Sequence, residues 1–486
     1  MRRNLVQAVI FDLDDTLVST SKLAQYRENG DREGLKENIA RSRVFDPVPN
    51  MLRAIENKGI PLALVSNSPR WYIDQVLEYH NIELFDVIVA YDDVGRAGVK
   101  PSGRGIELAL EGLELTKDSN VIYVGDKDID FVAAYHCNVK PIAPSWATTH
   151  PIDQVPAAIL NSTWLLSLLD DYDSISLIAD RTALERTFDF DKRQLNFIPL
   201  NEQGQVTALK KENIRLIALG RYFSQASTLT ASYHEAHQLS KDIFAKEESE
   251  TYVIPQYYVN LMAKVVESLP KYAFENEGAH FDIVTVIPAK KGKNPRLENF
   301  LRRIEKESNS NSMFIPDIFE FSPGATSLKT LGGFANRQAE LKNKLHLKRK
   351  YADLLAGKSV LVIDDVLTTG ASFGRSFELL EQCDSTFSMG VCLAKTVSVA
   401  EELGYCPECD SLLQVKTNSN TGIHFIGCTG FYETGCKYSK SITVAECPQC
   451  GDNIVKRFNS RDKSYFYGCE GYGKTGCTYK EPCEEI

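Results

Sequence analysis

Short apolar runs alternate with longer amphipathic stretches along the first 150 residues of the chain. Strands are predicted at VQAVIF, LALVSN, FDVIVA and NVIYVGD, and helices between them at PNMLRAIENKG and YIDQVLEYHN. Strands that alternate with helices of this length are typical of a parallel sheet that is covered on both faces. We therefore expect residues 1–150 to form a doubly wound, Rossmann-like α/β domain.

A second succession of this kind covers residues 206–402. Strands are predicted at IRLIALG, HFDIVTVIPA and SVLVIDD, and an amphipathic helix at HEAHQLSKDIFAK. We expect a second doubly wound parallel-sheet domain here. Residues 151–205 contain an apolar predicted helix, ILNSTWLLSLL, and we interpret them as a connector that packs onto one neighbouring domain.

The last part of the chain is an internal repeat of cysteines. Four cysteines spaced C-x2-C-x18-C-x7-C recur 41 positions later with identical spacing. The two sets are Cys406, Cys409, Cys428 and Cys436, followed by Cys447, Cys450, Cys469 and Cys477. Four sulfurs at such a spacing can close a tetrahedral Zn²⁺ site, and a fixed repeat indicates duplication. We expect two small zinc-binding units, over residues 403–441 and 442–486.

Composition narrows the class of protein. The length of 486 residues suits roughly three domains, and the formal net charge of −10 argues against a surface uniformly adapted to nucleic acid. Nine of the 12 cysteines follow residue 400, which favours metal binding in a reducing compartment over a disulfide framework. No signal peptide or apolar run of about 18 residues is visible. We expect a cytoplasmic protein with no membrane partner.

Acidic residues follow the first predicted strand in VIFDLDDTL. Asp12 and Asp14 come directly after the apolar run, with Thr16 beyond them. A carboxylate in this position can attack phosphorus, and a second acid two residues later can protonate the leaving oxygen and then activate water. This chemistry also requires a cation and a divalent metal ion. Candidates that follow later strands are Ser66, Lys100, Asp126 and Asp130.

All four of these motifs occur in the order found in haloacid dehalogenase superfamily phosphatases, and residues 1–150 resemble the phosphoglycolate-phosphatase-like branch of that family. A strand that merely ends in a solvated acidic turn explains one motif but not four in sequence. The resemblance implies that Asp12 is the nucleophile, Asp14 the general acid/base, Thr16 and Ser66 phosphate contacts and Lys100 the charge clamp. It further implies that Mg²⁺ is held by Asp12, Asp126 and the backbone carbonyl of Asp14, with support from Asp130.

The segment at residues 18–45 is short for the cap domain that many relatives insert there. A small cap excludes less water and admits larger substrates. The expected substrate is therefore a phosphorylated small molecule, a nucleotide or the phosphorylated end of a polymer.

A second acidic pair ends the predicted strand in VLVIDDVLTTGAS, residues 360–372. Asp364 and Asp365 suit ribose hydroxyls and an associated Mg²⁺, and the small polar turn that follows suits a phosphate at a helix start. This stretch resembles the phosphoribosyl-pyrophosphate loop of type I phosphoribosyltransferases, although a buried strand with a chance polar turn is the alternative. The resemblance implies phosphoribosyl pyrophosphate as co-substrate, with phosphate contacts from Thr368, Thr369, Gly370 and Ser372.

Upstream, VTVIPAKKGK resembles the pyrophosphate loop of the competence-protein (ComF-like) branch of these transferases. The resemblance places residues 288–291 in that loop, with Lys290 neutralising pyrophosphate, and makes Lys246 and Arg337 candidate phosphate contacts. A lysine-rich loop that is simply solvated is the alternative for Lys290. The insertion near PRLENFLRRIEKESNSNS leaves the identity of the acceptor base open.

The two cysteine units resemble the C-terminal zinc ribbons of bacterial type IA topoisomerases, which share the CP-x-C, GC and aromatic pattern. Such ribbons bind single strands through exposed rings. The candidate rings are Phe425, Phe431, Tyr432, Phe466, Tyr467 and Tyr472, and the candidate basic residues are Lys456, Arg457, Arg461 and Lys463. A purely structural or protein-docking role is the alternative. Cys483, Cys137, Cys383 and Cys392 are interpreted as free thiols.

These motifs predict a bifunctional enzyme: a Mg²⁺-dependent phosphatase joined to a phosphoribosyltransferase, with two Zn²⁺ ribbons that recruit single-stranded nucleic acid or a partner. In the coupled form of this hypothesis, the transferase makes a 5′-phosphorylated nucleotide and the phosphatase removes that phosphate. Two alternatives stay open. The chain could be a nucleic-acid-bound regulator that senses phosphoribosyl pyrophosphate, or a phosphatase that processes nucleic-acid ends held by the ribbons.

Overall fold

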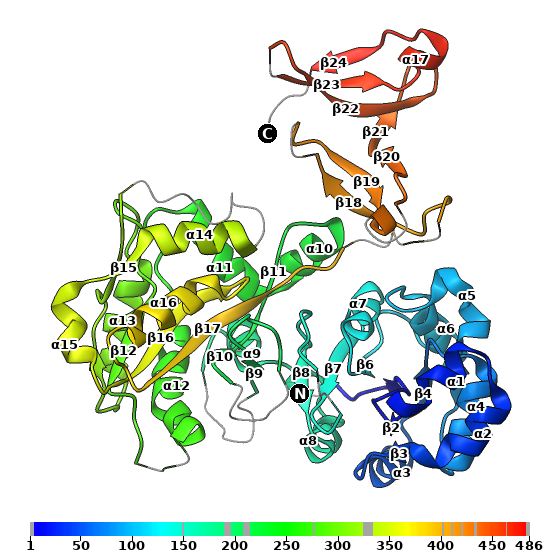
Figure 1. The fold of residues 1–486 in the computed structure, drawn as a ribbon, viewed down its shortest axis with the longest axis horizontal. Coiled ribbons are helices and arrows are strands. Elements are labelled where there is room, and N and C mark those ends of the chain that lie inside the picture. The colour runs from blue at the N-terminus through cyan, green and yellow to red at the C-terminus, as the bar shows by residue number, and fades with distance from the viewer. Residues whose placement is uncertain are drawn as a thin grey trace. The chain divides into compact units, whose positions relative to one another are not determined.

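The computed structural model divides into two compact units, Met1–Val399 and Ala400–Ile486 (Figure 1). The first unit contains two lobes, each built on its own sheet. The structure describes residues 4–147, 150–188, 196–207, 214–274, 276, 278–323, 334–400, 403–409, 411, 413–418, 421–431, 435–462 and 464–482.

The first lobe has a six-stranded sheet in the order β5-β4-β1-β6-β7-β8, in which every neighbouring pair is parallel. Its strands are β1 (Ala8–Phe11), β4 (Leu62–Val65), β5 (Val87–Val89), β6 (Val121–Val124), β7 (Lys140–Pro144) and β8 (Ala158–Leu160). The central strand β1 therefore ends between the ends of β4 and β6, where side chains from three strands can meet.

Helices cover both faces of this sheet, as the sequence predicts. They are α3 (Val48–Asn57), α4 (Arg70–Tyr79), α5 (Tyr91–Gly98), α6 (Arg104–Gly112), α7 (Asp128–His136) and α8 (Ser162–Leu168). Alternate β1 residues enter different cores, because side chains alternate across a strand. Phe11 packs in the core that contains α3 and α4, whereas Ile10 packs against α6. The expected parallel, doubly wound sheet of the first domain is thus confirmed.

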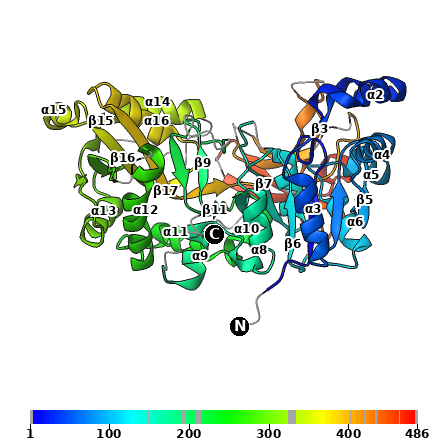
Figure 2. The same cartoon turned by 90° about the horizontal axis from the view of Figure 1, so that it is seen from below.

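A small insert separates β1 from α3. It consists of β2 (Val18–Ser19), η1 (Ser21–Leu23), α1 (Ala24–Glu28), α2 (Arg32–Asn38), η2 (Ile39–Arg41) and β3 (Arg43–Val44). The strands β2 and β3 pair antiparallel and close the insert at its base. Leu23 and Leu35 anchor it to the core of the lobe. Figure 2 shows α2 at the upper edge of the lobe.

The second lobe has a mainly parallel sheet in the order β13-β12-β16-β17-β10-β9, with β11 also paired to β17. Its strands are β9 (Ile198–Leu200), β10 (Leu216–Ala218), β11 (Arg221–Phe223), β12 (Ile283–Val286), β13 (Met313–Phe314), β16 (Ser359–Leu367) and β17 (Phe387–Val397). Only the β9–β10 pair is antiparallel among these described strands. Because β12 and β16 are parallel neighbours, the loops that follow them lie side by side.

Both faces of the second sheet are also covered. The helices of this lobe are α9 (Ile178–Glu185), α10 (Thr228–Ala236), α11 (Gln238–Glu248), α12 (Gln256–Phe274), α13 (Arg296–Glu307), α14 (Phe334–Lys344), η6 (Arg349–Tyr351), α15 (Ala352–Leu355) and α16 (Ala371–Glu381), whereas η3 (Tyr172–Ser174) packs against the first lobe. Leu361 packs in the core that contains α12 and α13, and Val362 packs in the core that contains α16. A separate hairpin joins β14 (Phe319–Phe321) to β15 (Leu345–Leu347).

Residues 151–205 contribute a strand to each sheet instead of only connecting the lobes. Strand β8 extends the first sheet beside β7, and β9 forms the antiparallel edge beside β10. The predicted helix is therefore shorter than its apolar run, because Ala158–Leu160 pairs with β7 and α8 begins only at Ser162. Phe131 and Tyr135 of α7 share a hydrophobic core with Ile198 of β9, which explains why both lobes form one compact unit.

The second unit consists of two small antiparallel sheets, one for each cysteine repeat. Their elements are β18 (Leu413–Thr417), β19 (His424–Cys428), η7 (Thr429–Phe431), β20 (Ser439–Ser441), β21 (Thr443–Glu446), β22 (Asn453–Asn459), β23 (Ser464–Cys469), α17 (Tyr472–Thr475) and β24 (Lys480–Pro482). In the part of the chain that the structure describes, no helix has the length and apolar character needed to cross a membrane.

Candidate functional site

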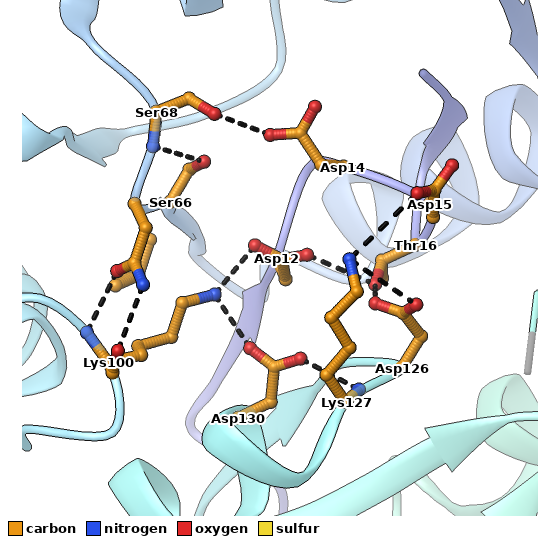
Figure 3. Close-up of polar contacts among 12 residues, drawn as sticks. Asp12, Asp14, Asp15, Thr16, Ser66, Ser68, Lys100, Asp126, Lys127 and Asp130 are labelled. Carbon is orange, nitrogen blue, oxygen red and sulfur yellow. Dashed lines mark hydrogen bonds and ion pairs between the residues drawn. The ribbon is translucent and has the colours of Figure 1, made fainter. Parts of the chain in front are cut away.

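Asp12, Lys100 and Asp130 form a buried ion-pair cluster where β1 and its neighbours end. Lys100 Nζ lies 2.6 Å from Asp12 Oδ1 and 2.6 Å from Asp130 Oδ1 (Figure 3). The Tyr123 hydroxyl lies 2.9 Å from the same nitrogen. All four side chains are buried. Two carboxylates and a hydroxyl thus fix the ammonium group beside Asp12.

Asp126 completes a group of three carboxylates with Asp12 and Asp130, whose ligand oxygens all lie within 4.8 Å of one another. The Thr16 hydroxyl lies 3.0 Å from Asp126 Oδ1 and 3.3 Å from Asp12 Oδ2. Burial raises the pKa of Asp12 to about 6 although Lys100 opposes it. Burial and the neighbouring carboxylates raise the pKa of Asp126 to about 8. Three crowded carboxylates carry more negative charge than Lys100 can balance, and carboxylate oxygens are ligands that Mg²⁺ prefers. The group therefore fits Mg²⁺.

The Asp14 side chain points away from these three carboxylates, toward Ser68 (Figure 3). Its Oδ1 accepts hydrogen bonds from the hydroxyls of Thr20 at 2.6 Å and Tyr72 at 2.9 Å. Its Oδ2 accepts from the Ser68 hydroxyl at 2.6 Å and pairs with Arg27 Nη1 at 3.2 Å. Burial opposes ionisation, but Arg27 and the three hydroxyls outweigh it and lower the pKa of Asp14. The side chain of Asp14 therefore lies outside the group of three carboxylates that could hold a metal.

Sequence reasoning identified Ser66 but missed Ser68, Tyr72 and Arg27. The Ser66 hydroxyl accepts a hydrogen bond from the Ser68 amide at 3.1 Å and lies in the same loop after β4 (Figure 3). Tyr72 lies in the first turn of α4 and Ser68 lies two residues before this helix, so no regular spacing in the sequence links them. No local pattern marks Arg27, because its role depends on how the insert at residues 18–44 brings α1 to Asp14.

The second acidic pair, Asp364 and Asp365, lies beside two cations and inside β16, which continues to Leu367 instead of ending at the acids as predicted. Asp365 Oδ2 lies 3.0 Å from Lys246 Nζ and 2.8 Å from Arg296 Nη2. The sequence suggested Lys246 but not Arg296, which lies at the start of α13 in the insertion. Burial opposes ionisation of Asp365, but both cations hold its pKa well below its usual range. Burial, with Asp365 adjacent, raises the pKa of Asp364 to about 8.

The polar turn after β16 leads into α16 as expected. Thr368 Oγ1 lies 3.2 Å from Thr396 Oγ1 of β17. Gly370 has a left-handed φ of 75°, and a β-carbon at this position would lie 3.0 Å from the Glu202 carbonyl oxygen. Glycine is therefore required both by the backbone angle and by the turn at residues 201–205 that packs against it.

Replacing Gly370 with alanine is expected to lower the free energy of unfolding by about 1–3 kcal/mol. The matched control is Gly374→Ala in the same helix, where a β-carbon would have no neighbour within 4 Å. That change should raise the free energy of unfolding by about 0.5–1 kcal/mol, because alanine favours a helix interior. Denaturant unfolding of both variants checks the pair, and equal effects would contradict the described turn.

The predicted pyrophosphate loop borders a different space. Lys290 Nζ lies 5.7 Å from the centre of the Phe321 ring, and burial lowers the pKa of Lys290. A cavity of about 900 Å³ is lined by Pro288, Ala289, Lys291, Glu298 and the β14–β15 hairpin. The structure thus brings Lys246 to Asp365 but turns Lys290 toward the hairpin. Arg337 lies in α14, and its side chain is outside the described residues.

Each cysteine repeat closes into one cluster. The Sγ–Sγ distances are 3.6 Å for Cys406–Cys436, 3.3 Å for Cys409–Cys428, 3.7 Å for Cys447–Cys477 and 3.4 Å for Cys450–Cys469. A tetrahedral site with Zn–S bonds of about 2.3 Å has sulfurs about 3.8 Å apart, so both clusters fit Zn²⁺. Gly430 and Gly471 each donate a backbone hydrogen bond of 3.2 Å to the third cysteine of their cluster.

The candidate nucleic-acid rings divide into exposed and packed groups. Phe431 is 47% exposed and Tyr472 is 67% exposed, which makes them the most accessible of the described rings. Tyr467 packs against the cysteines of its own ribbon. Lys456 Nζ lies 4.5 Å from the centre of the Tyr465 ring. Tyr432, Lys463 and Cys483 lie outside the described residues.

Comparisons with known proteins agree with two parts of this description. Residues 32–143 match the family model of haloacid dehalogenase-like hydrolases, and residues 403–443 and 444–486 each match the topoisomerase DNA binding C4 zinc finger. The chain therefore contains a haloacid dehalogenase-like hydrolase domain and two C4 zinc ribbons of the topoisomerase type.

Relatives with curated names cover the first lobe. The pyrophosphatase PpaX of Bacillus cereus is 26% identical over 184 residues, which span 29% of this chain and 84% of the relative. The phosphoglycolate phosphatase of Aquifex aeolicus is 28% identical over 150 residues, which span 30% of this chain and 69% of the relative.

Solved structures with similarity to the chain include a HAD-superfamily hydrolase from Ehrlichia chaffeensis and a putative beta-phosphoglucomutase from Thermotoga maritima. The first is 18% identical with a TM-score of 0.27 and covers 35% of this chain and 97% of its own. The second is 22% identical with a TM-score of 0.27 and covers 34% of this chain and 98% of its own.

Proposed function

We propose that the haloacid dehalogenase-like domain is a Mg²⁺-dependent phosphohydrolase that works through an aspartyl phosphate on Asp12. The observation that carries this proposal is the buried Lys100 bridge between Asp12 and Asp130, with Asp126 in the same group. Such an arrangement holds a nucleophilic carboxylate beside fixed positive charge and an oxygen-ligand set for a divalent ion. The names of the relatives, a pyrophosphatase and a phosphoglycolate phosphatase, support the same reaction class.

In this proposal the reaction has two successive displacements at phosphorus, first by Asp12 and then by water, and each residue has a separate role in them. The Asp12 carboxylate attacks phosphorus while Lys100 holds it in place and screens the phosphoryl oxygens. Asp14, two residues later, gives a proton to the departing oxygen and then accepts one from the water that releases phosphate. Mg²⁺ held by Asp12 and Asp126, with Asp130 in support, would supply the remaining positive charge. The test is phosphate release from pyrophosphate, phosphoglycolate and nucleoside monophosphates, with and without Mg²⁺.

For the second lobe we propose binding of phosphoribosyl pyrophosphate, followed by phosphoribosyl transfer. The support is the position of Asp364 and Asp365 near the end of β16, which continues to Leu367 before the polar turn and the start of α16. Backbone N–H groups at a helix start suit a phosphate. Asp365 is neutralised here by Lys246 and Arg296. If the Asp365 carboxylate bonds to the ribose hydroxyls instead, both cations become available to bind the pyrophosphate group.

Replacing Asp365 with asparagine is expected to weaken phosphoribosyl-pyrophosphate binding by about tenfold to a hundredfold, the value of one or two charge-assisted hydrogen bonds. Isothermal titration calorimetry in Mg²⁺ measures this. The matched control is Asp353→Asn on the exposed side of α15, which should leave the affinity unchanged. Equal affinity of the Asp365 variant and the unchanged protein would contradict the proposed site.

Binding alone does not distinguish a transferase from a sensor. Pyrophosphate release with a mixture of bases, read by mass spectrometry of the products, supports transfer. Binding without turnover of any base supports the regulator. The exposed rings of Phe431 and Tyr472 favour recruitment of single-stranded nucleic acid by the ribbons in either case.

A further inference from the structure

Arg27 reaches from the insert into the hydrolase site. It lies in α1, and its Nη1 is 3.2 Å from Asp14 Oδ2 and 3.3 Å from the Ser68 hydroxyl oxygen. The guanidinium carbon lies 5.7 Å from the centre of the Tyr72 ring. The insert is anchored by buried leucines on both sides of α1. The position of Arg27 is therefore set by the fold of the insert.

Among the described residues that contact the Asp14 carboxylate, Arg27 is the one cation. The other three are the hydroxyls of Thr20, Ser68 and Tyr72, and each of these residues is at most 3% exposed. The side chain of Arg27 is 28% exposed. A partly exposed side chain can turn from Asp14 toward a ligand more readily than three buried hydroxyls can.

The site has two chemically different sides. Lys100, Asp130 and Asp126 lie on one side of Asp12, and Asp14 faces Ser68 on the other (Figure 3). The phosphoryl group must contact Asp12 and the side of the site that carries Lys100, Asp126 and Asp130. Because the leaving group receives a proton from Asp14, it must lie on the side where Arg27 enters. A cation at this point is matched to a leaving group that carries negative charge, not to a neutral alcohol.

We propose that Arg27 selects substrates whose leaving group is itself an anion, with inorganic pyrophosphate as the simplest member of the class. This inference rests on the proposed function of the first lobe. The bond from Asp12 to one phosphorus forms as the bridging P–O bond breaks, and the departing phosphate keeps the electron pair and takes a proton from Asp14. Arg27 pairs with the oxygens of that phosphate. Water then splits the aspartyl phosphate, so pyrophosphate and water give two phosphates.

The test compares kcat/KM for pyrophosphate with kcat/KM for glycerol phosphate, whose leaving group is neutral. Arg27→Ala should lower the value for pyrophosphate about a hundredfold and the value for glycerol phosphate less than about threefold. Arg27→Gln keeps a hydrogen-bond donor for Asp14 and should show the same selective loss. Arg27→Lys keeps the charge without the fork geometry and should restore part of the pyrophosphate activity.

The matched control is Arg32→Ala. Arg32 lies on the next helix of the insert, and its guanidinium carbon is 5.3 Å from the centre of the Trp71 ring. Its loss should leave both substrates unchanged. Equal losses on both substrates in Arg27→Gln would overturn the inference, because Arg27 would then only hold Asp14. The inference would also be overturned if kcat/KM of the protein without substitutions were higher for glycerol phosphate than for pyrophosphate. If the protein hydrolysed none of the phosphorylated compounds tested, the proposed phosphohydrolase function itself would be contradicted.

Discussion

Replacing Asp12 with asparagine is expected to lower phosphate release by about four orders of magnitude or more, because an amide cannot form the aspartyl phosphate. The fold should persist. Lys100 keeps Asp130 as a partner at 2.6 Å, and the substitution removes one of three crowded carboxylates. We therefore expect a melting temperature that does not fall in the absence of Mg²⁺. Phosphate release and thermal unfolding, measured on the same preparation, check both parts.

The matched control for this change is Asp118→Asn. Asp118 is exposed in the loop before β6, at the opposite end of that strand from Asp126. It should retain full activity. A variant at Asp12 that keeps more than about one per cent of the activity would assign the chemistry to another group.

Replacing Cys469 with serine is expected to unfold the second ribbon and halve the bound zinc. Structural zinc sites contribute about 10–16 kcal/mol of apparent binding free energy, which is folding free energy in so small a unit. The buried cluster of this ribbon consists of Cys447, Ile454 and Cys469, and it offers little apolar area to replace the metal. Metal analysis should show one zinc ion instead of the two that the two cysteine clusters predict.

The control for the zinc measurement is Cys383→Ser, since Cys383 lies outside both clusters. It should retain the full zinc content. Limited proteolysis gives a second readout, because the Cys469 variant should be cut within residues 442–486 while residues 4–147 stay intact. Unchanged zinc content in the Cys469 variant would contradict the tetrahedral assignment.

The sequence predicted the strand-end positions well because parallel strands bring their carboxyl ends to one edge. Thr16 and Asp126 are 110 residues apart in the chain, and their side chains meet at 3.0 Å. The cysteine repeat was equally predictable, since the spacing itself defines the cluster. In both cases the deciding information is local: an apolar run, a fixed offset and a residue type.

The remaining features depend on tertiary packing and left no local pattern. Arg27 and Arg296 reach acidic residues from short inserted segments whose direction the sequence does not reveal. Ile159 and Leu160 were predicted as the start of a helix, but they pair with β7 as part of a strand. Lys290 follows the expected strand, but its ammonium group lies over the aromatic ring of Phe321 in the β14–β15 hairpin.

The shared core of the two lobes bears on how their proposed reactions relate. A phosphoribosyl transfer in the second lobe would release pyrophosphate, which is the anion that Arg27 suits on the leaving-group side. Hydrolysis of that product would draw the transfer forward. The coupling expected from the sequence, dephosphorylation of the nucleotide, stays a separate hypothesis; it differs in that its nucleoside leaving group has no charge for Arg27.

The most direct test of the account is to trap the phosphorylated enzyme with Asp14→Asn. This variant keeps Asp12 and Lys100 but lacks both the acid of the first step and the base of the second, so the phosphorylated form should build up slowly and should not turn over. The full chain is mixed with Mg²⁺ and pyrophosphate, quenched in acid and mapped by peptide mass spectrometry. The account predicts one added phosphoryl group on Asp12, absent from the Asp12→Asn protein. A phosphoryl group on another residue, or phosphate released without a covalent form, would contradict it.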